Sequence, residues 1–239
     1  MNKKTTLLLT GRDPVSGHII VNILNKIDKN KFKIILILQN PAYKIVSKKN
    51  LINFIFQKKL NNKRKLLSTS INYLKKYNPD IVLANSSGPD YGIDESIICA
   101  ANKKKIKSFC IQSYWGDINH AFESEPDCYL VLDNFAKKIT RQKSKKKIKI
   151  IGSIRHQNYK NIDINYNSIY LFNKLKYNYD SKIFCFFGQP TNFIDDYIET
   201  INKFYFFIKK NICDLKFVYK THPKESKKQI NKIISLFKK

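Results

Sequence analysis

The sequence predicts an α/β protein: a Rossmann-like parallel sheet flanked by helices, followed by a short second βαβα region. Short apolar runs alternate with segments of helical periodicity along the whole chain, which is typical of βαβ units. Most of these runs are continuously apolar, as expected of strands that are covered by helices on both faces. A polar stretch rich in Asn and Tyr then interrupts the pattern. We therefore expect an N-terminal Rossmann-like domain at 1–156, a connecting segment at 157–181 and a partial C-terminal Rossmann-like region at 182–239.

Six apolar runs in the first part are predicted to be strands. They lie at 5–10, 32–38, 80–84, 107–112, 128–132 and 148–151. Between them, apolar residues recur at helical spacing, as at Ile20, Ile23, Leu24 and Ile27. Such stripes mark the helix faces that pack against the sheet.

The second part supplies a strand at 183–187, a helix at 195–210, a strand at 215–219 and a lysine-rich helix at 224–237. Two strands make a poor independent domain. Either this region packs on the first part, or the chain is a shortened version of something longer, such as one half of a split enzyme that a partner chain completes.

Composition narrows the class of protein. The chain has 239 residues, of which 43% are hydrophobic, but it has no apolar run long enough for a membrane-spanning helix, so a cytoplasmic protein is expected. The five cysteines show no Cys-x-x-Cys or Cys/His spacing. They are interpreted as reduced core residues, and no metal site is expected.

The net charge of +27 raises the question of polyanion binding, but 45 Lys and Arg residues include only four arginines. Nucleic-acid recognition favours the bidentate guanidinium, so no specific nucleic-acid partner is expected. The excess of Lys and Asn over Gly is instead consistent with A/T-rich coding. The stretch 51–76 combines apolar residues with lysines. It is either an interfacial helix pair that contacts the inner membrane face peripherally or an ordinary amphipathic surface helix.

In a doubly wound sheet the ligand lies at the carboxyl ends of the strands. After the first strand come Gly11, Arg12, Ser16, Gly17 and His18. A turn of this kind exposes backbone N–H groups at the start of a helix, where an anion is favoured. His18 is a candidate general base, with a capping or packing role as the alternative.

A second loop, after the third strand, contains Ser86, Ser87, Gly88, Tyr91 and Gly92. Two glycines in one short loop of a glycine-poor chain indicate that a particular backbone geometry is required there. Asp94 and Glu95 follow in the first turn of the next helix, where a structural role through the helix dipole is as well founded as a catalytic one.

A third loop contains Tyr114, Trp115 and Asp117. Two adjacent aromatic residues beside a carboxylate fit a wall for stacking a sugar or base, while an aromatic plug that closes the sheet is the alternative. Arg155 and His156 follow the last strand of the first part. We expect them at the mouth of a cleft.

In the second part, Gly188 and Gln189 follow one strand, and Lys220, His222 and Pro223 follow the next. A lysine and a histidine separated by one residue provide a cation and an imidazole donor for a phosphate group.

The sequence resembles the GT-B glycosyltransferase superfamily in four features. These are the two Rossmann-like regions, the Ser16–Gly17–His18 turn, the Ser86–Gly92 loop and the string Lys220–Thr221–His222–Pro223. The Lys-x-His-Pro string is similar to the His-Pro motif of bacterial sialyltransferases and CDP-glycerol glycerophosphotransferases, and to that of UDP-N-acetylglucosamine 2-epimerases. The resemblance implies an acceptor-binding first domain and a nucleotide-binding second one. It also implies that His222 contacts the donor phosphate with Lys220, Gly188 and Gln189 nearby. Domains of this type usually continue well beyond the His-Pro strand, so the resemblance predicts a shortened form.

The resemblance implies a nucleotide-sugar-dependent glycosyltransferase of surface-polysaccharide synthesis. Its partners would be a nucleotide-sugar donor and a glycan acceptor, and it would need no separate cofactor. His18 or Asp117 would deprotonate the acceptor hydroxyl. The alternatives are a UDP-sugar 2-epimerase-like enzyme and a catalytically inactive module that binds a nucleotide, a sugar or another chain.

Overall fold

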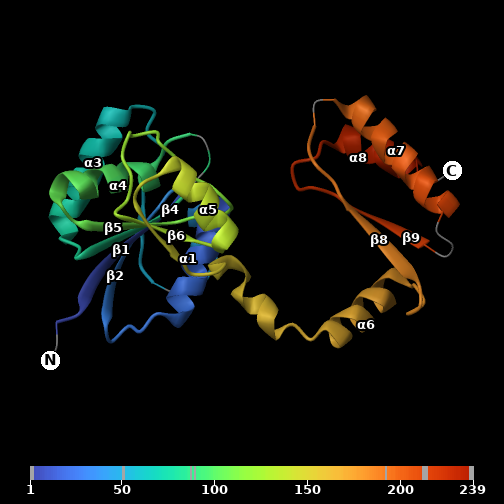
Figure 1. Ribbon diagram of the computed structural model, residues 1–239, viewed down its shortest axis with the longest axis horizontal. Coiled ribbons are helices and arrows are strands. Elements are labelled where there is room, and N and C mark those ends of the chain that lie inside the picture. Colours follow the sequence, from blue (N-terminus) through green and yellow to red (C-terminus); the bar gives the residue numbers. More distant parts are fainter. Residues whose placement is uncertain are drawn as a thin grey trace. The chain divides into compact units, whose positions relative to one another are not determined.

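The computed structural model describes residues 3–49, 52–86, 88, 90–191, 193–211 and 215–236. The chain divides into two compact units, residues 1–161 and residues 162–239, which are described separately (Figure 1).

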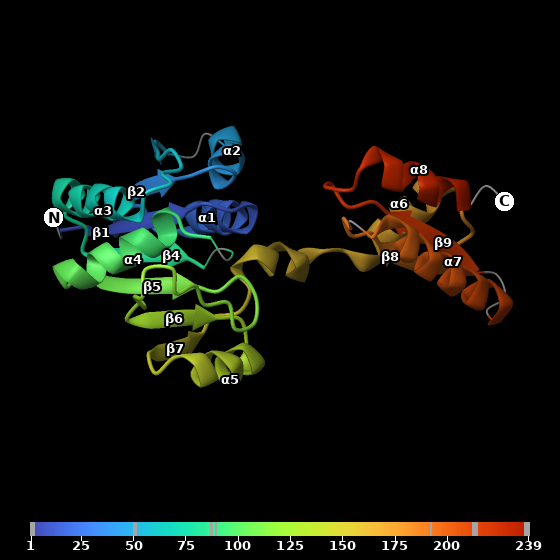
Figure 2. The same cartoon turned by 90° about the horizontal axis from the view of Figure 1, so that it is seen from above.

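Unit 1 is built on a seven-stranded parallel sheet with the strand order β3-β2-β1-β4-β5-β6-β7. Figure 2 shows the strands side by side, with β7 at one edge. The strands are β1 (Thr5–Gly11), β2 (Phe32–Leu38), β3 (Ile55–Phe56), β4 (Ile81–Asn85), β5 (Lys107–Ile111), β6 (Cys128–Val131) and β7 (Lys147–Ile150). The predicted Rossmann-like sheet is confirmed. The chain reverses direction across the sheet between β1 and β4, which creates the switch point where doubly wound folds bind ligands.

Helices cover both faces of this sheet. They are α1 (Pro14–Lys26), α2 (Ala42–Val46), α3 (Lys63–Tyr77), α4 (Ile93–Lys104) and α5 (Asn134–Lys143), with 3-10 turns η1 (Ser47–Lys49) and η2 (Ile154–Asn161). Strand β1 shows why both faces are filled. Leu7 and Leu9 belong to one buried cluster with Ile20 of α1, whereas Leu8 belongs to another with Ile97 of α4. Successive side chains of a strand point to opposite faces, so the continuously apolar runs reflect burial on both sides.

Helix starts are set by local side chains. Asp13 accepts a hydrogen bond from the backbone N–H of Ser16 at 2.6 Å, and the Ser16 hydroxyl accepts one from the Asp13 N–H at 3.1 Å. This capping box, with Pro14 at the first helical position, fixes where α1 begins.

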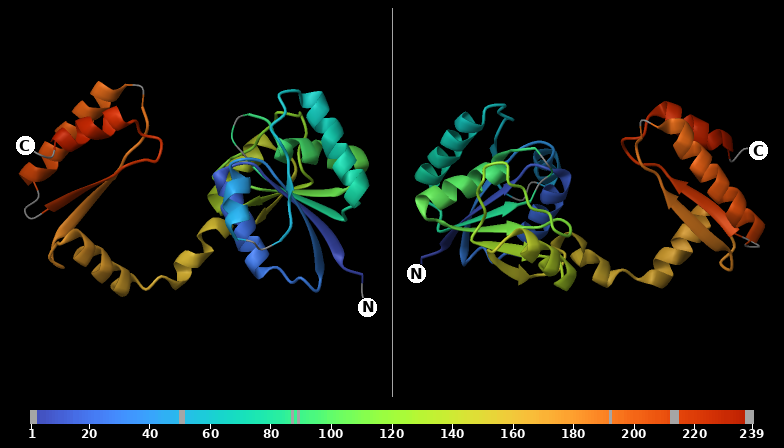
Figure 3. Two further views of the ribbon diagram at one scale, coloured as in Figure 1. Left: turned by 180° about the vertical axis from the view of Figure 1, so that it is seen from behind. Right: turned by 45° about the horizontal axis from the view of Figure 1, so that its top comes forward.

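Unit 2 contains a two-stranded parallel sheet, β8 (Lys182–Phe187) and β9 (Leu215–Lys220), with α6 (Ile164–Leu175), α7 (Ile194–Asn211) and α8 (Lys227–Leu236). Figure 3 shows α7 and α8 packed beside each other. The buried apolar side chains are Ile201 and Ile208 of α7 and Ile233 of α8. Phe184 of β8 stacks on Phe217 of β9, with ring centroids 5.7 Å apart.

The stretch 157–181, which is expected to be a connecting segment, contains regular structure. It includes the end of η2 and the whole of α6, whose N-cap is Asp163. None of the α6 residues is fully buried. Apolar residues do recur at helical spacing in α6, at Ile164, Leu171, Phe172 and Leu175, but they lie among Asn and Tyr residues that obscure the pattern.

The helix pair expected at 51–76 is also absent from the described residues. Residues 52–62 form irregular chain around the two-residue strand β3, and only α3 is helical. The apolar residues Ile55 and Phe56 form the edge strand β3. The next residue extends the pairing with β2, because the Gln57 N–H donates to the Leu38 carbonyl at 2.8 Å. No described helix is long and apolar enough to cross a membrane.

The cysteine prediction holds for three positions. Cys99, Cys110 and Cys128 are buried thiols, but Cys185 on β8 is exposed. Its neighbours Phe184 and Phe186 pack against Phe204 of α7, and successive side chains of a strand point to opposite faces. Cys213 lies outside the described residues.

The core packing of α4 gives a stability prediction. Ile97 is fully buried, so Ile97→Ala should lower the free energy of unfolding by about 2 to 5 kcal/mol. The measurement is urea unfolding followed by the fluorescence of Trp115, the single Trp of the chain, which reports on unit 1. Ile150→Ala on β7 of the same unit, whose side chain is 44% exposed, is the matched control and should lower this value by less than about 1 kcal/mol. Equal effects of the two substitutions would contradict the assigned packing.

Candidate functional site

Three loops meet at the switch point of unit 1, and Arg12, directly after β1, joins them. Its guanidinium Nη2 donates to the carbonyl of Gly88 at 2.9 Å and to the carbonyl of Asp90. The same nitrogen lies 3.4 Å from Glu95 Oε1 on α4. Both side chains are largely buried, at 15% and 5% exposed. Arg12 thus ties the loop after β4 to the start of α4.

Asn119, from the loop after β5, reaches the same three acceptors. Its Nδ2 donates to the carbonyls of Gly88 and Asp90 at 2.7 and 2.8 Å, and to Glu95 Oε1 at 3.1 Å. Glu95 Oε2 accepts the N–H of Gly92 at 2.8 Å. A Cβ added at Gly92 would collide with the Arg12 side chain and come within 2.6 Å of Gln39 Oε1, so a glycine is required there.

The two acidic residues at the start of α4 point inward. Asp94 is fully buried, and its Oδ1 accepts the Thr10 hydroxyl proton at 2.5 Å. Burial and the neighbouring Asp94 carboxylate raise the pKa of Glu95 to about 8, against the lowering effect of Arg12. Their contacts are with groups of the fold itself, which favours the structural interpretation of this pair.

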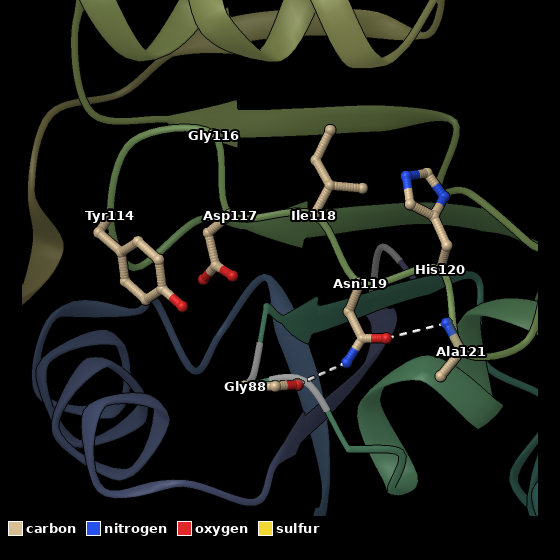
Figure 4. A pocket seen from close by; sticks show the side chains of 8 residues that line it. All are labelled: Gly88, Tyr114, Gly116, Asp117, Ile118, Asn119, His120 and Ala121. Carbon is tan, nitrogen blue, oxygen red and sulfur yellow. Dashed lines mark hydrogen bonds between the residues drawn. The ribbon is translucent and has the colours of Figure 1, made fainter.

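A cavity of about 460 Å³ lies beside this network (Figure 4). It is lined by Gly88, Tyr114, Gly116, Asp117, Ile118, Asn119, His120 and Ala121. Asp117 is 7% exposed, and its Oδ2 is buried with no hydrogen-bond partner among the described residues. Burial raises the pKa of Asp117, although the polar groups of Ser86, Ser113 and Tyr114 beside it act in the opposite direction. A carboxylate oxygen of this kind can accept a proton or a hydrogen bond from a ligand hydroxyl.

The two adjacent aromatic residues of this loop do not share a role. Tyr114 lines the cavity, but Trp115 is not among the lining residues. The Trp115 indole Nε1 donates to Asp133 Oδ2 at 2.9 Å, and its ring packs edge-on against Phe135 of α5 at 6.3 Å. The stacking wall predicted from the sequence is therefore divided between the cavity and an exposed patch.

The turn after β1 is shaped mainly by packing. A Cβ added at Gly11 would approach Ile20 Cδ1 to 2.6 Å, and one at Gly17 would approach the Ala42 backbone to 3.2 Å. Ser16 is buried in the capping box. His18 is the fifth residue of α1 and is exposed, so the cap does not use it and the cavity at Asp117 does not include it.

The loop after β4 is only partly described, because Ser87 lies outside the described residues. Ser86 is buried and its hydroxyl donates to the Asp117 carbonyl at 3.0 Å. A Cβ at Gly88 would meet open space, so crowding does not demand a glycine there.

Tyr91 lines a second cavity of about 300 Å³, together with Arg12, Gln39, Lys58 and Lys59. Gln39, which follows β2, also accepts the N–H of Ile93 at 2.8 Å. Gln39 and Asn119 were not selected from the sequence. The available signal was that Gln39 directly follows β2 and that Asn119 lies in the loop after β5, but an amide side chain in a loop carries no distinctive pattern.

Arg155 and His156 lie in η2 of unit 1. His156 Nδ1 forms a hydrogen bond with the Ser153 hydroxyl at 2.9 Å, and its ring stacks on Tyr159 at 5.2 Å. Both residues are exposed, and neither lines the Asp117 cavity.

In unit 2 the loops after β8 and β9 are joined by a polar network centred on Glu225, which is 9% exposed. Glu225 Oε1 accepts the Tyr219 hydroxyl proton at 2.5 Å and an amide proton of Gln229 at 3.1 Å. Gln229 also donates to the Gln189 carbonyl at 2.8 Å, and Gly188 N–H donates to the Lys220 carbonyl at 2.9 Å. The predicted residues Gly188, Gln189 and Lys220 therefore lie together.

His222 is fixed within this network. Its backbone N–H donates to Glu225 Oε2 at 2.9 Å, and its ring Nδ1 accepts the Lys224 N–H at 3.1 Å. In the neutral ring the proton then resides on Nε2. His222 is partly exposed, while Pro223 and Lys220 are exposed. The sequence missed Glu225, whose function as a loop anchor depends on its burial.

Comparisons with solved structures place this arrangement among known folds. MnaA of S. aureus in complex with UDP matches 98% of this chain at 14% identity, with a TM-score of 0.63; 66% of its own length is covered. UDP-GlcNAc 2-epimerase from Neisseria meningitidis bound to UDP-GlcNAc matches 98% at 14% identity, with a TM-score of 0.62 and 70% coverage. A glycosyltransferase from Rickettsia africae matches 99% at 16% identity, with a TM-score of 0.63 and 65% coverage.

The matched structures are GT-B-type folds, and this chain has a fold of that type. The chain spans about two thirds of the length of the structures that it matches. No protein-family model and no curated protein matches the sequence.

The buried acids of unit 1 predict a pH-dependent stability. The pKa of Glu95 lies above its ordinary value of 4.5, at about 8, so the folded protein retains a proton that the unfolded chain has lost. This contribution to stability is full below about pH 4.5 and is lost as the pH rises through about 8. Urea unfolding of unit 1, followed by Trp115 fluorescence, should show lower stability at pH 8 than at pH 5.

Glu95→Gln should reduce this dependence, because the amide does not titrate. Glu123→Gln, at an exposed position, is the control and should leave the dependence unchanged. A Glu95→Gln profile as steep as that of the unsubstituted chain would show that Glu95 is not the titrating group.

Proposed function

We propose that the protein binds a nucleotide-sugar through unit 2 and acts as a nucleotide-sugar-dependent glycosyltransferase of surface-polysaccharide synthesis. The observation that carries the proposal is the fixed imidazole of His222 at the carboxyl end of β9. With Nδ1 engaged by the Lys224 N–H, the Nε2 proton is available for a ligand, and Lys220 adds a cation from the same strand end. A histidine donor beside a lysine suits the phosphates of a nucleotide.

Unit 1 would hold the acceptor. The cavity at Asp117 is large enough for a sugar ring, and the unpartnered Oδ2 suits the abstraction of a hydroxyl proton. The raised pKa of Asp117 makes its carboxylate a stronger base than an exposed aspartate. His18, the other candidate base, is exposed on α1, so Asp117 is the better supported of the two.

A UDP-sugar 2-epimerase-like activity is the second candidate. It is favoured by the matched structures of that kind, one of them bound to UDP-GlcNAc. An epimerase needs no acceptor, so the same Asp117 would act on the sugar itself. The third candidate is an inactive binding module that pairs with another chain, and it is favoured by the two-stranded sheet of unit 2.

Nucleotide binding is tested by thermal shift with CMP, CDP, UDP, GDP and their sugar conjugates. A ligand at about 100 times its dissociation constant stabilises the folded protein by about 2.7 kcal/mol, so one base class should raise the melting temperature.

His222→Ala should weaken the affinity for that ligand about tenfold or more, because a phosphate loses a charge-assisted hydrogen bond. His18→Ala is the matched control and should leave affinity unchanged. Equal affinities in the two variants would reject the role of His222, and no shift with any nucleotide would favour the inactive module.

Asp117→Asn tests the catalytic assignment. The substitution keeps the shape of the side chain but removes the base, so turnover should fall about 100-fold or more while nucleotide affinity is retained. The assay follows the products formed from the stabilising nucleotide-sugar, with and without glycan acceptors. Acceptor-dependent release of nucleotide supports the transferase, whereas a changed sugar without acceptor supports the epimerase. Full turnover in Asp117→Asn would exclude Asp117 as the base.

A further inference from the structure

One edge of unit 1 combines a strong positive charge with exposed apolar side chains. Between Asp133 and Asp163 the sequence has no acidic residue but ten lysines and arginines. This stretch includes α5, the edge strand β7 and the connection between them. Figure 2 shows α5 beside β7 at the edge of the sheet. Seven exposed lysines lie there: Lys137, Lys138, Lys143, Lys145, Lys146, Lys147 and Lys149.

Apolar side chains are exposed on the same edge of unit 1. Phe135 is 61% exposed and Trp115 is 54% exposed, and their rings pack edge to face. Ile150 and Ile151, at the end of β7, are 44% and 38% exposed. The Trp115 indole is held by its hydrogen bond to Asp133, so the aromatic pair is positioned rather than loose. The described ion pairs all lie outside residues 134–157, which leaves this charge uncompensated within the protein.

We infer that this α5–β7 edge binds the surface of an anionic membrane. Lysines beside a bilayer gain from its negative surface potential, while Trp and Phe favour the boundary between headgroups and acyl chains. The charge and the exposed apolar groups are both explained by this one occupant. The inference goes beyond the proposed activity and does not depend on nucleotide binding.

Other occupants fit less well. A second copy of the chain would bring lysines against lysines, and lysines on an edge strand hinder pairing with another strand. A nucleic acid would use the cations but would leave Ile150 and Ile151 without an apolar environment, and its recognition favours arginine. The stretch 51–76, for which the sequence left membrane contact as one of two alternatives, is less suitable because Lys59 pairs with Asp90 and Lys63 donates to the Ala121 carbonyl.

The test uses the full chain with vesicles of phosphatidylglycerol and phosphatidylcholine, and with vesicles of phosphatidylcholine alone. The protein should sediment with the anionic vesicles at 0.05 M salt and much less at 0.5 M salt, since exposed charges are then screened. Trp115, the single Trp, should shift its emission to shorter wavelength on binding. Sedimentation without any change in Trp115 emission would overturn the proposed surface.

Two charge-reversal variants locate the contact. The first carries Lys137→Glu, Lys138→Glu, Lys145→Glu and Lys146→Glu. The control carries Lys75→Glu, Lys76→Glu, Lys103→Glu and Lys104→Glu, at exposed positions on α3 and α4, and it changes the net charge equally. The first should weaken vesicle binding at least about tenfold and the control less than about twofold. Circular dichroism establishes that both variants are folded.

Equal loss of binding in both variants would show that net charge alone drives association and would overturn the inference. A single-stranded oligonucleotide that displaces the protein from vesicles and binds more tightly than they do at 0.15 M salt would also overturn it, in favour of a nucleic-acid surface. Phe135→Ser tests the apolar contribution and should reduce binding at 0.5 M salt more than at 0.05 M salt.

Discussion

The buried pairing of Arg12 with Glu95 is the interaction on which the site of unit 1 depends. Arg12 and Asn119 donate to the same carbonyls of Gly88 and Asp90 and to the same Glu95 oxygen. Removing one partner of a buried pair leaves the other's polar atoms without hydrogen bonds, which is costlier than losing an exposed ion pair. Three loops are therefore held together by groups that cannot be exchanged singly, and the cavity at Asp117 inherits its shape from them.

In unit 1, acidic side chains are buried near the site, whereas lysines dominate the surface. Three carboxylates, those of Asp94, Glu95 and Asp117, are buried near the switch point, whereas the surface carries the large excess of lysine. Hydrogen bonds and Arg12 stabilise the interior acids. Glu95 is also protonated over a wider pH range than an exposed glutamate, because its pKa is raised. The surface lysines are free to serve solubility and, at the α5–β7 edge, association with anionic lipid.

Unit 2 uses a different device to order its loops. A single buried carboxylate, Glu225, accepts from the Tyr219 hydroxyl and from the His222 backbone and thereby sets the imidazole. Hydrogen bonds to a charged group are the stronger kind, which suits a unit with few buried apolar side chains. Because Glu225 positions His222, small changes in the loop after β9 would alter the proposed phosphate site.

The sequence by itself determined the alternation of strands and helices, because burial on both faces of a parallel sheet leaves continuous apolar runs such as 32–38. It also placed Asp117 and His222 at strand ends. Only the tertiary structure decided which of the predicted residues meet. It separated Trp115 from Tyr114, left His18 exposed and brought in Asn119, Gln39 and Glu225. Long-range contacts and burial, unlike periodicity, are not encoded in any short window of the chain.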